Sequence, residues 1–499
     1  SVFRRADGTR GAERAVIEFR FGPWLPDATD YKNPGLETCK NAIPSPGGYQ
    51  PALGFSAALA DVGASVLSAK SFERKDGTRI TVCATAGDLH VIIGGTVTDS
   101  TLSLTLTAAP VFEQFGPSIW ATEKNGGTWV LADIEADTTF AAASNTIPSA
   151  RALWRVGDFL FAGNLTDTDI SDQPYRIRWS PFNNPGGDWE TDIGTQSDAV
   201  DMPFEYGAVM GGSGWAFGVI LQRSAISRIS YTGGTSVFAK EIVDRQRGCS
   251  SSASVVAVGD RVYFLSDDGF FFTDGGPAQV ISRGRVWQWF QSNVGQTRLE
   301  NVKGAVDWPN RCVIWTMPND DGVIFGRVYF NWETEQWSYV EGAADCLFSS
   351  GKDGLTLEQV AALYPDLDAM DVSLDSALFR AQGRQLAAFV GGELVTTTGD
   401  ALAMEMETGE FQVAPGKRCY VSEVLPLITN PDDTTVVELR GRVLQNQAFT
   451  QTGEVATGPL GFAPFNFDAR YFRVRTVVPA QTLWADAWGF QMEVAASGW

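Results

Sequence analysis

Short strand-like segments that meet at Gly-Asp turns recur along the chain, and this repetition constrains the fold most. VGDFLFAG (Val156–Gly163) echoes VGDRVYFLS (Val258–Ser266), and AGDLHVIIGG (Ala86–Gly95) is a looser third copy. A tryptophan follows each copy in a similar setting, in GGTW (Gly126–Trp129), GGDW (Gly186–Trp189) and VWQW (Val286–Trp289). Self-similarity at a period of about 40–45 residues, with strands only, predicts the blades of a β-propeller.

The repeating part covers 56–345 and is expected to form a propeller-like body of β-meanders. The chain has 52 Gly and 31 Phe, which suits tight turns between half-buried strands. Because the period is irregular, a series of unrelated hairpins in a β-sandwich is the alternative.

The first part of the chain, 1–55, is expected to form an irregular N-terminal arm and platform segment. The alternating run Val16–Phe21 predicts one strand. The stretch Phe21–Phe55 is dense in Pro, Gly and Asn, which excludes a long helix or a central strand. Its aromatic residues provide anchors, so we expect an ordered, wrapping arm that packs against another surface.

The last third of the chain divides into two expected parts. A connecting insertion, 346–410, combines closing strands with one short helix. Thr356 can cap the run LEQVAAL, with Gln359 at the third helical position as in a capping box. A C-terminal β domain, 411–499, follows. Its expected strands are Val421–Ile428, Thr434–Leu444 and Tyr471–Val478.

Charge and composition exclude several classes of function. The 38 basic and 59 acidic residues give a net charge of −21, which lacks the basic footprint of a nucleic-acid-binding protein. His90 is the single histidine, so a histidine-dependent triad is not expected and a multi-histidine metal site is excluded. No CxxC spacing occurs, which predicts free buried thiols and no zinc site. The six cysteines are Cys39, Cys83, Cys249, Cys312, Cys346 and Cys419.

Local motifs that could carry chemistry are incomplete. TEKNGGTW (Thr122–Trp129) is similar to the Asp-box turn of sialidase-like propellers, but Lys124 stands where that turn needs Asp. DTDISD (Asp167–Asp172) and SDDG (Ser266–Gly269) place acids together without the spacing of a calcium loop. GGSGWAFG (Gly211–Gly218) lacks the GK[ST] of a phosphate loop. We therefore expect no catalytic, cofactor-binding or metal-binding residues, and no enzyme.

Two basic segments have a structural and a binding interpretation. Arg176, Arg178, Trp179 and Trp189 could form a sugar-binding or stacking surface, but a blade strand with a long ordered turn is the preferred interpretation. YFRVRTVV (Tyr471–Val478) places Arg473 and Arg475 on one face of a strand, which indicates a solvated sheet face in preference to a phosphate contact.

Three motifs in the arm lead into a family resemblance. Asn33–Leu36, Asn41–Pro44 and Gly48–Pro51 read Asn-Pro-Gly-Leu, Asn-x-Ile-Pro and Gly-Tyr-x-Pro. In this order, the motifs resemble the opening of the tail nozzle, or tail tubular, proteins of short-tailed bacteriophages. These are also called packaged-DNA-stabilising or head-completion proteins. Further similar segments are Arg176–Trp189, Tyr231–Phe238, Ser266–Gly276 and Arg470–Arg475.

The resemblance implies a structural virion component that forms a homohexameric ring. Such a ring lies below the portal and its adaptor, continues the DNA channel, and helps to retain and then release the packaged genome. Its partners are portal-side connector proteins and tail fibre or needle proteins, and DNA passes without specific binding. The resemblance transfers no catalytic residue or cofactor, and it places the protein in the virion tail, assembled in the host cytoplasm.

The residues themselves agree with this expectation without deciding it. A conduit needs a wall that DNA does not grip, and a net charge of −21 suits such a wall. The alternative is a carbohydrate-binding or carbohydrate-active propeller that acts as a tail receptor-binding protein. A secreted adhesin is a third possibility. It is disfavoured because the start SVFRRADGTR has no apolar core of a signal peptide. No apolar run approaches the roughly 20 residues of a membrane span, so no membrane is expected.

Overall fold

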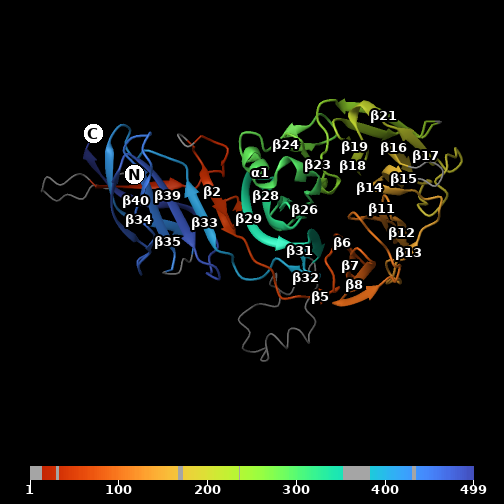
Figure 1. The fold of residues 1–499 in the computed structure, drawn as a ribbon, viewed down its shortest axis with the longest axis horizontal. Coiled ribbons are helices and arrows are strands. Elements are labelled where there is room, and N and C mark those ends of the chain that lie inside the picture. The colour runs from red at the N-terminus through yellow and green to blue at the C-terminus, as the bar shows by residue number, and fades with distance from the viewer. Residues whose placement is uncertain are drawn as a thin grey trace.

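The computed structural model describes residues 14–29, 33–166, 172–234, 236–351, 383–429 and 434–498. The chain forms two β regions side by side, a propeller at the right and a sandwich at the left of Figure 1. Both ends of the described chain lie in the sandwich, where Arg14 pairs with Ala495. The predicted all-β, propeller-like fold is confirmed.

Blades 1 to 4 are separate four-stranded sheets of consecutive antiparallel strands. Blade 1 contains β6 (Ser68–Glu73), β7 (Arg79–Ala84), β8 (Leu89–Ile93) and β9 (Thr96–Asp99). Blade 2 contains β10 (Val111–Phe115), β11 (Ser118–Glu123), β12 (Gly127–Leu131) and β13 (Ala141–Ala142). Blade 3 contains β14 (Ser149–Val156), β15 (Phe159–Thr166), β16 (Gln173–Trp179) and β17 (Asp198–Asp201). Blade 4 contains β18 (Val209–Gly214), β19 (Gly218–Gln222), β20 (Ile226–Tyr231) and β21 (Phe238–Asp244).

Three further four-stranded units follow in the described part of the chain. Blade 5 contains β22 (Val256–Val258), β23 (Arg261–Ser266), β24 (Gly269–Thr273) and β25 (Gln279–Val280). Blade 6 contains β26 (Gly304–Asp307), β27 (Cys312–Pro318), β28 (Ile324–Asn331) and β29 (Gln336–Ala344). Blade 7 contains β30 (Cys346–Gly351), β31 (Arg384–Val390), β32 (Glu393–Thr396) and, from the start of the propeller segment, β5 (Ala60–Asp61). The first and last parts of this segment therefore share one blade.

Hydrophobic clusters between successive blades hold the ring together. Blades 1 and 2 bury Val82 and Ile119 in one cluster, and blades 3 and 4 bury Trp154 and Ile220 in another. Corresponding clusters join blades 2 and 3, 4 and 5, 6 and 7, and 7 and 1, and a larger one includes blades 5 and 6. Each sheet buries both faces against its neighbours, which explains why its middle strands are almost wholly apolar.

The sequence echoes occupy two different positions in the blades. Val156–Gly163 and Val258–Ser266 each span the turn between the first and second strands of a blade, with a left-handed glycine at Gly157 and Gly259. The looser copy, Ala86–Gly95, spans the turn between the second and third strands of blade 1. Similar turn chemistry at successive strand junctions therefore produced the third match.

The sandwich interleaves the N-terminal and C-terminal segments of the chain. One sheet runs β3–β4–β40–β34–β38, with β1 also paired to β40, and the other contains β2, β33, β39, β35, β36 and β37. The strands of the first sheet are β1 (Arg14–Arg20), β3 (Ala42–Ser45), β4 (Gly48–Pro51), β34 (Arg418–Ile428), β38 (Ala463–Ala469) and β40 (Ala487–Gly498). Those of the second are β2 (Leu36–Lys40), β33 (Met404–Thr408), β35 (Val436–Arg442), β36 (Thr450–Gln451), β37 (Val455–Ala456) and β39 (Tyr471–Val478).

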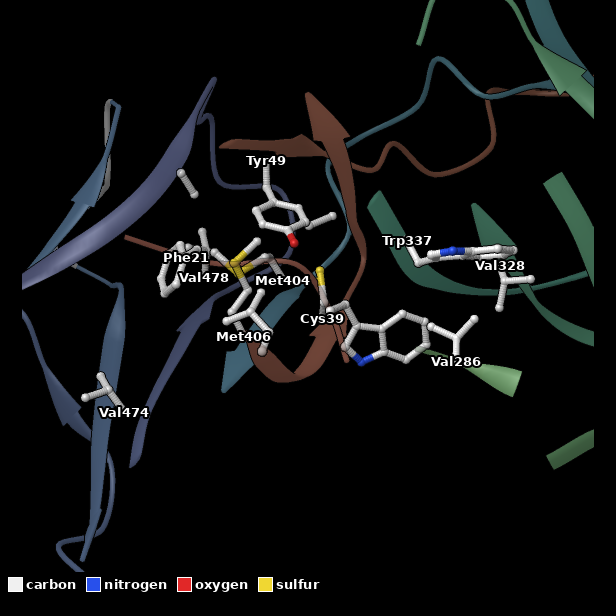
Figure 2. Close-up of a cluster of buried hydrophobic side chains, with 14 of the residues drawn as sticks. Phe21, Cys39, Tyr49, Val286, Val328, Trp337, Met404, Met406, Val474 and Val478 are labelled. Carbon is white, nitrogen blue, oxygen red and sulfur yellow. The ribbon is translucent and has the colours of Figure 1, made fainter. Parts of the chain in front are cut away.

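A continuous sheet and a common core join the propeller to the sandwich. β2 pairs in parallel with β29 of blade 6 and antiparallel with β33, so ten strands form one sheet across both regions. Figure 2 shows Cys39 and Tyr49 between Met404 of the sandwich and Trp337 of blade 6. The joint is therefore a packed interior and not a linker.

The described residues of the arm are not irregular as expected, because they form strands in the body of their own chain. β1 to β4 contribute strands to the sandwich, and Trp24, Leu36 and Tyr49 are buried. β1 pairs with β40 at the opposite end of the chain, so no local sequence pattern predicts this pairing. Removal of 1–55 would thus remove core strands, and a soluble truncated monomer is not expected.

The propeller also extends past the expected boundary at 345, because blade 7 lies in the segment expected to be a connecting insertion. The stretch 352–382 separates β30 from β31 and hides the blade pattern. The helix expected from Thr356 to Leu363 lies outside the described residues.

The α-helix of the described chain is α1 (Trp287–Val294), which occupies the VWQW segment that was grouped with the blade tryptophans. The carboxylate of Asp27 accepts the backbone N–H groups of Gln288 and Trp289, each at 2.8 Å. A helix begins there because a distant residue satisfies its first donors. Short 3-10 turns are η1 (Phe204–Tyr206), η2 (Ser252–Ser254) and η3 (Gln296–Asn301).

Candidate functional site: the central cavity of the propeller

The inner strands of blades 1 to 5 surround a cavity of about 660 Å³ at the centre of the propeller. Its walls come from β6, β10, β14, β18 and the segment η2–β22. Small-molecule sites commonly occupy roughly 300–1,000 Å³. The cavity is therefore the candidate functional site of the described chain.

Glycines of β18 shape one wall of the cavity. A Cβ on Gly212 would lie 2.4 Å from Cε2 of Trp154, and a Cβ on Gly214 would lie 2.4 Å from the backbone oxygen of Arg155. Only glycine lets β14 and β18 approach so closely. The segment Gly211–Gly218 thus forms a strand and a turn, and no helix follows it as in a phosphate loop.

Cationic side chains outnumber carboxylates on the cavity lining. Lys70 donates to Glu113 Oε2 at 2.7 Å and to the Phe112 oxygen at 3.0 Å. Arg155 donates to the Gly157 oxygen at 2.7 Å, and its guanidinium lies 5.0 Å from the ring centroid of Phe115. These two cations are therefore held by the protein itself.

The third cation of the lining, Arg151, bonds to a residue near another blade. Its Nε donates to Ser252 Oγ at 3.1 Å, which links β14 of blade 3 to the η2 turn that precedes blade 5. Beside it, the indole of Trp154 lines the same space and is 3% exposed. Its Nε1 is buried and meets no hydrogen-bond acceptor among the described residues.

The acid content of the lining decides which chemistry the cavity offers. Glycoside hydrolysis usually requires two carboxyl groups on opposite sides of the substrate. Glu113 is the one carboxylate on the described lining, and Lys70 already neutralises it. The described lining thus holds one carboxylate where such hydrolysis uses two.

The aromatic and basic residues considered for a stacking surface are part of blade 3 and its long turn. Trp179 and Trp189 are 2% and 0% exposed, and their indole N–H groups donate to the backbone oxygens of Gln196 and Pro185, each at 2.9 Å. Arg176 makes two hydrogen bonds to Asp201, which holds the pKa of that carboxyl below its usual value. The preferred structural interpretation of Trp179 and Trp189 agrees with this burial.

Arg178 is also buried, and its Nη1 lies 3.8 Å from Glu190 Oε1. Because Trp179 and Trp189 are buried as well, neither tryptophan offers a ring face to a sugar or a base.

Acidic turns considered for calcium are engaged by basic side chains. Asp172 pairs with Lys124, and the rest of DTDISD lies outside the described residues. Asp267 accepts from Arg223 at 2.8 Å, and Asp268 pairs with Arg247 at 3.3 Å. Within the described ranges, no three His, Cys, Asp or Glu side chains gather as a metal site.

The lone histidine takes part in a hydrogen-bonded chain that sequence reasoning did not identify. His90 Nε2 lies 3.0 Å from Thr85 Oγ1, and His90 Nδ1 lies 2.7 Å from Asp99 Oδ1. The order resembles a nucleophile, base and orienting acid. However, Thr85 and His90 are buried and are not part of the cavity lining. The hydrogen bonds from Thr85 through His90 to Asp99 therefore stabilise the strands of blade 1.

Arg473 and Arg475 do not form the solvated basic face that was expected. They belong to an Arg–Glu ladder on the second sheet of the sandwich, in which Arg475 Nε donates to Glu405 at 2.7 Å. Adjacent strands place guanidinium and carboxylate groups opposite each other, and most of them are buried or half-buried. The ladder contains Arg440, Arg442, Arg473 and Arg475 with Glu405, Glu407, Glu410 and Glu438.

The six cysteines are free and buried, as composition predicted. Burial raises the pKa of the Cys249 thiol to about 11, so it stays protonated near neutral pH. No helix among the described residues is long and apolar enough to cross a membrane.

Comparisons with known proteins give distant structural similarity and no family. The sequence matches no protein-family model, and no curated protein sequence matches it. Among solved structures, the WD40 domain of Neurospora crassa Pan2 aligns with 68% of this chain and 94% of its own, at 7% identity and a TM-score of 0.36. Virginiamycin B lyase from Staphylococcus aureus aligns with 61% of this chain and 96% of its own, at 14% identity and a TM-score of 0.33.

An exo-β-1,3-galactanase from Phanerochaete chrysosporium covers 79% of this chain and 97% of its own, at 10% identity and a TM-score of 0.27. At such scores these neighbours carry no argument about function. The class of the protein is defined by its own strands: an all-β chain with a propeller and a sandwich on one sheet.

Proposed function

We propose that this protein is a structural component of a virion tail: the nozzle of a short-tailed bacteriophage. In this proposal, six copies form a ring below the portal and its adaptor. The ring continues the DNA channel and helps to retain and then release the genome. The proposal starts from the resemblance of the arm motifs, and the place of these motifs in the fold supports it.

The motif residues lie at the joint between the propeller and the sandwich. Asn41 has a left-handed φ of 57°. Its side chain donates to the Ala403 oxygen at 2.8 Å and accepts from the Glu341 N–H at 2.9 Å. Tyr49 is fully buried and donates to the Gly22 oxygen at 2.9 Å. These contacts connect the arm, which contains β2, to β29 of the propeller and to β33 of the sandwich. The position of the motif residues at this joint is the observation that carries the proposal.

A joint of this kind suits a part that must resist force. One sheet and one core run through both regions, so a load on the sandwich reaches the propeller without a flexible linker. The ladder carboxylates form ion pairs with its guanidinium groups, and the net charge of −21 opposes attachment to passing DNA. The proposed role needs no enzymatic activity or cofactor.

The first test is the mass of the purified full-length protein in solution, by light scattering, alone and with the adaptor ring of its virion. A particle of six 54.0 kDa subunits, or a monomer that becomes a ring on the adaptor, is the expected result. A chain that stays monomeric on the adaptor, and that binds polysaccharide instead, would contradict the nozzle and favour the receptor-binding alternative.

A further inference from the structure

We propose that the central cavity of the propeller binds a small molecule that carries a carboxylate or a phosphate group, with Arg151 as the anchor. The ligand class is a sugar acid or a sugar phosphate of the size of one or two sugar units. The inference is separate from the nozzle proposal, because it concerns the interior of a single propeller.

Arg151 is placed like a ligand-binding residue. It is exposed to the cavity, and the described residues bring no carboxylate within ion-pair distance of its guanidinium. Ser252 accepts from Nε at 3.1 Å, which orients the planar group and leaves both Nη atoms for another acceptor. A guanidinium offers paired N–H donors that match the two oxygens of a carboxylate or phosphate.

The other cations of the cavity contrast with Arg151. Lys70 is held by Glu113, and Arg155 by the Gly157 oxygen and by Asp158, whose Oδ1 lies 3.7 Å away. Their charges still add to the potential inside a cavity with low-dielectric walls, where field lines concentrate. A lining with three cations and one carboxylate is thus an exception in a chain with net charge −21, and it selects for anions.

The remaining walls offer neutral contacts for the rest of such a ligand. β18 is the innermost strand of blade 4, so its free edge faces the cavity and provides peptide groups for hydroxyls. Trp215 adds an aromatic surface. A volume of about 660 Å³ holds a ligand of this size but not a folded chain or a DNA duplex.

The test is isothermal titration of the full-length protein at low ionic strength. The probes are glucuronate, glucose 6-phosphate, neutral glucose and inorganic phosphate. Both anionic sugars are expected to bind at roughly millimolar concentration or below, at least about tenfold more tightly than glucose, and less tightly in high salt. Inorganic phosphate alone, bound as well as the sugar phosphate, would still support the anion site and would identify phosphate as the recognised group.

Variants assign the site. Arg151→Gln is expected to weaken binding of the anionic sugars about tenfold or more, because it removes a charge-assisted contact. The matched control is Arg311→Gln, which removes an exposed cation of blade 6 that pairs with Glu333 away from the cavity and leaves binding unchanged.

Three results would overturn the proposal. They are no binding of either anionic sugar to the wild type, equal binding of glucose and glucuronate, and full binding by Arg151→Gln. Arg151 is exposed, so the folding of that variant can be verified by an unchanged melting curve.

Discussion

The propeller and the sandwich are both built from strands, yet the chain closes them in opposite ways. Nearly every strand of the propeller pairs with its sequence neighbour, and small clusters between blades hold the ring. In the sandwich, β1 pairs with β40 and β2 with β33, from opposite ends of the chain. Local pairing leaves a repeat in the sequence, whereas distant pairing leaves none.

The two regions also treat their charges differently. The sandwich pairs its guanidinium groups with carboxylates in a ladder, as Glu410 pairs with Arg442 through contacts of 2.7 and 2.6 Å. The propeller leaves Arg151 with one hydroxyl partner at the edge of a cavity. The ladder therefore serves the fold, and the cavity retains a group for a ligand.

The largest expected effect tests whether the shared core makes the two regions one cooperative unit. Trp337 lies in the core that both regions share and is 1% exposed, so Trp337→Ala is expected to cost roughly 3–5 kcal/mol. Chemical denaturation should show a single transition at lower denaturant. The control Trp488→Ala, at a site 38% exposed, is expected to change stability by less than about 1 kcal/mol. Two separated transitions in the wild type would refute the shared unit.

A second change tests whether the ladder is structural. Arg442→Met leaves the fully buried carboxylate of Glu410 without its partner, so we expect a loss of roughly 3–5 kcal/mol. Arg311 forms an exposed pair with Glu333, and Arg311→Met is expected to leave the free energy of unfolding nearly unchanged. Equal melting temperatures for the two variants would show that the ladder contributes no more than a surface pair.

A third change tests the glycine wall of the propeller. Gly212→Ala places a Cβ against the Trp154 ring, so the buried indole must move, at an expected cost of roughly 1–3 kcal/mol. Gly87→Ala is the control, because nothing lies within 4 Å of its added Cβ. If urea denaturation finds the two variants equally stable, β14 and β18 do not require this close approach.

The smallest expected effect is a pH dependence at the closure of the ring. Lys303 donates to the backbone oxygens of Leu67 and Asp345 at 2.8 and 3.1 Å, and burial lowers its pKa below the ordinary value of 10.5. Between the lowered pKa and 10.5 the unfolded chain binds more protons, so the Lys303 contribution makes stability rise with pH there.

Lys303→Met should remove that rise. The quantity to measure is the difference in unfolding free energy between wild type and variant from about pH 8 to about pH 10. Taking the difference between wild type and variant removes the pH dependence that the other titratable groups contribute to both proteins. A difference that stays constant over this range would mean that the Lys303 charge is not penalised by burial.

Some elements could be predicted from the sequence because their signals are local. The strand expected at Tyr471–Val478 has those same bounds in the structure, since alternation and β-branched residues suffice to define it. The Gly-Asp turns of Val156–Gly163 and Val258–Ser266 mark the same junction in two blades for a similar reason. The strand expected near Trp179 is β16, and its long turn contains Trp189, as the Pro-, Gly- and Asn-rich segment predicted.

Other features had no local signal. Asp27 accepts the first N–H groups of α1 from 261 and 262 positions away, so the VWQW segment carried no local sign of a helix. Arg151 lies in β14 of blade 3 and Ser252 in the η2 turn that precedes blade 5, and the two meet only in the folded chain. The chain Thr85–His90–Asp99 had a weak signal in its short spacing, but only the strand register brings its polar atoms within hydrogen-bond distance.

The sequence by itself determined the all-β class, the repeated blades, the buried free thiols and the acidic character, because composition and short periodic patterns specify each of these. Only the tertiary structure decided how the ring closes through β5, how the two ends of the chain build one sandwich, and which cation remains free in the central cavity. Those outcomes depend on contacts between residues that are distant along the chain. Such contacts form through packing, which no local pattern records.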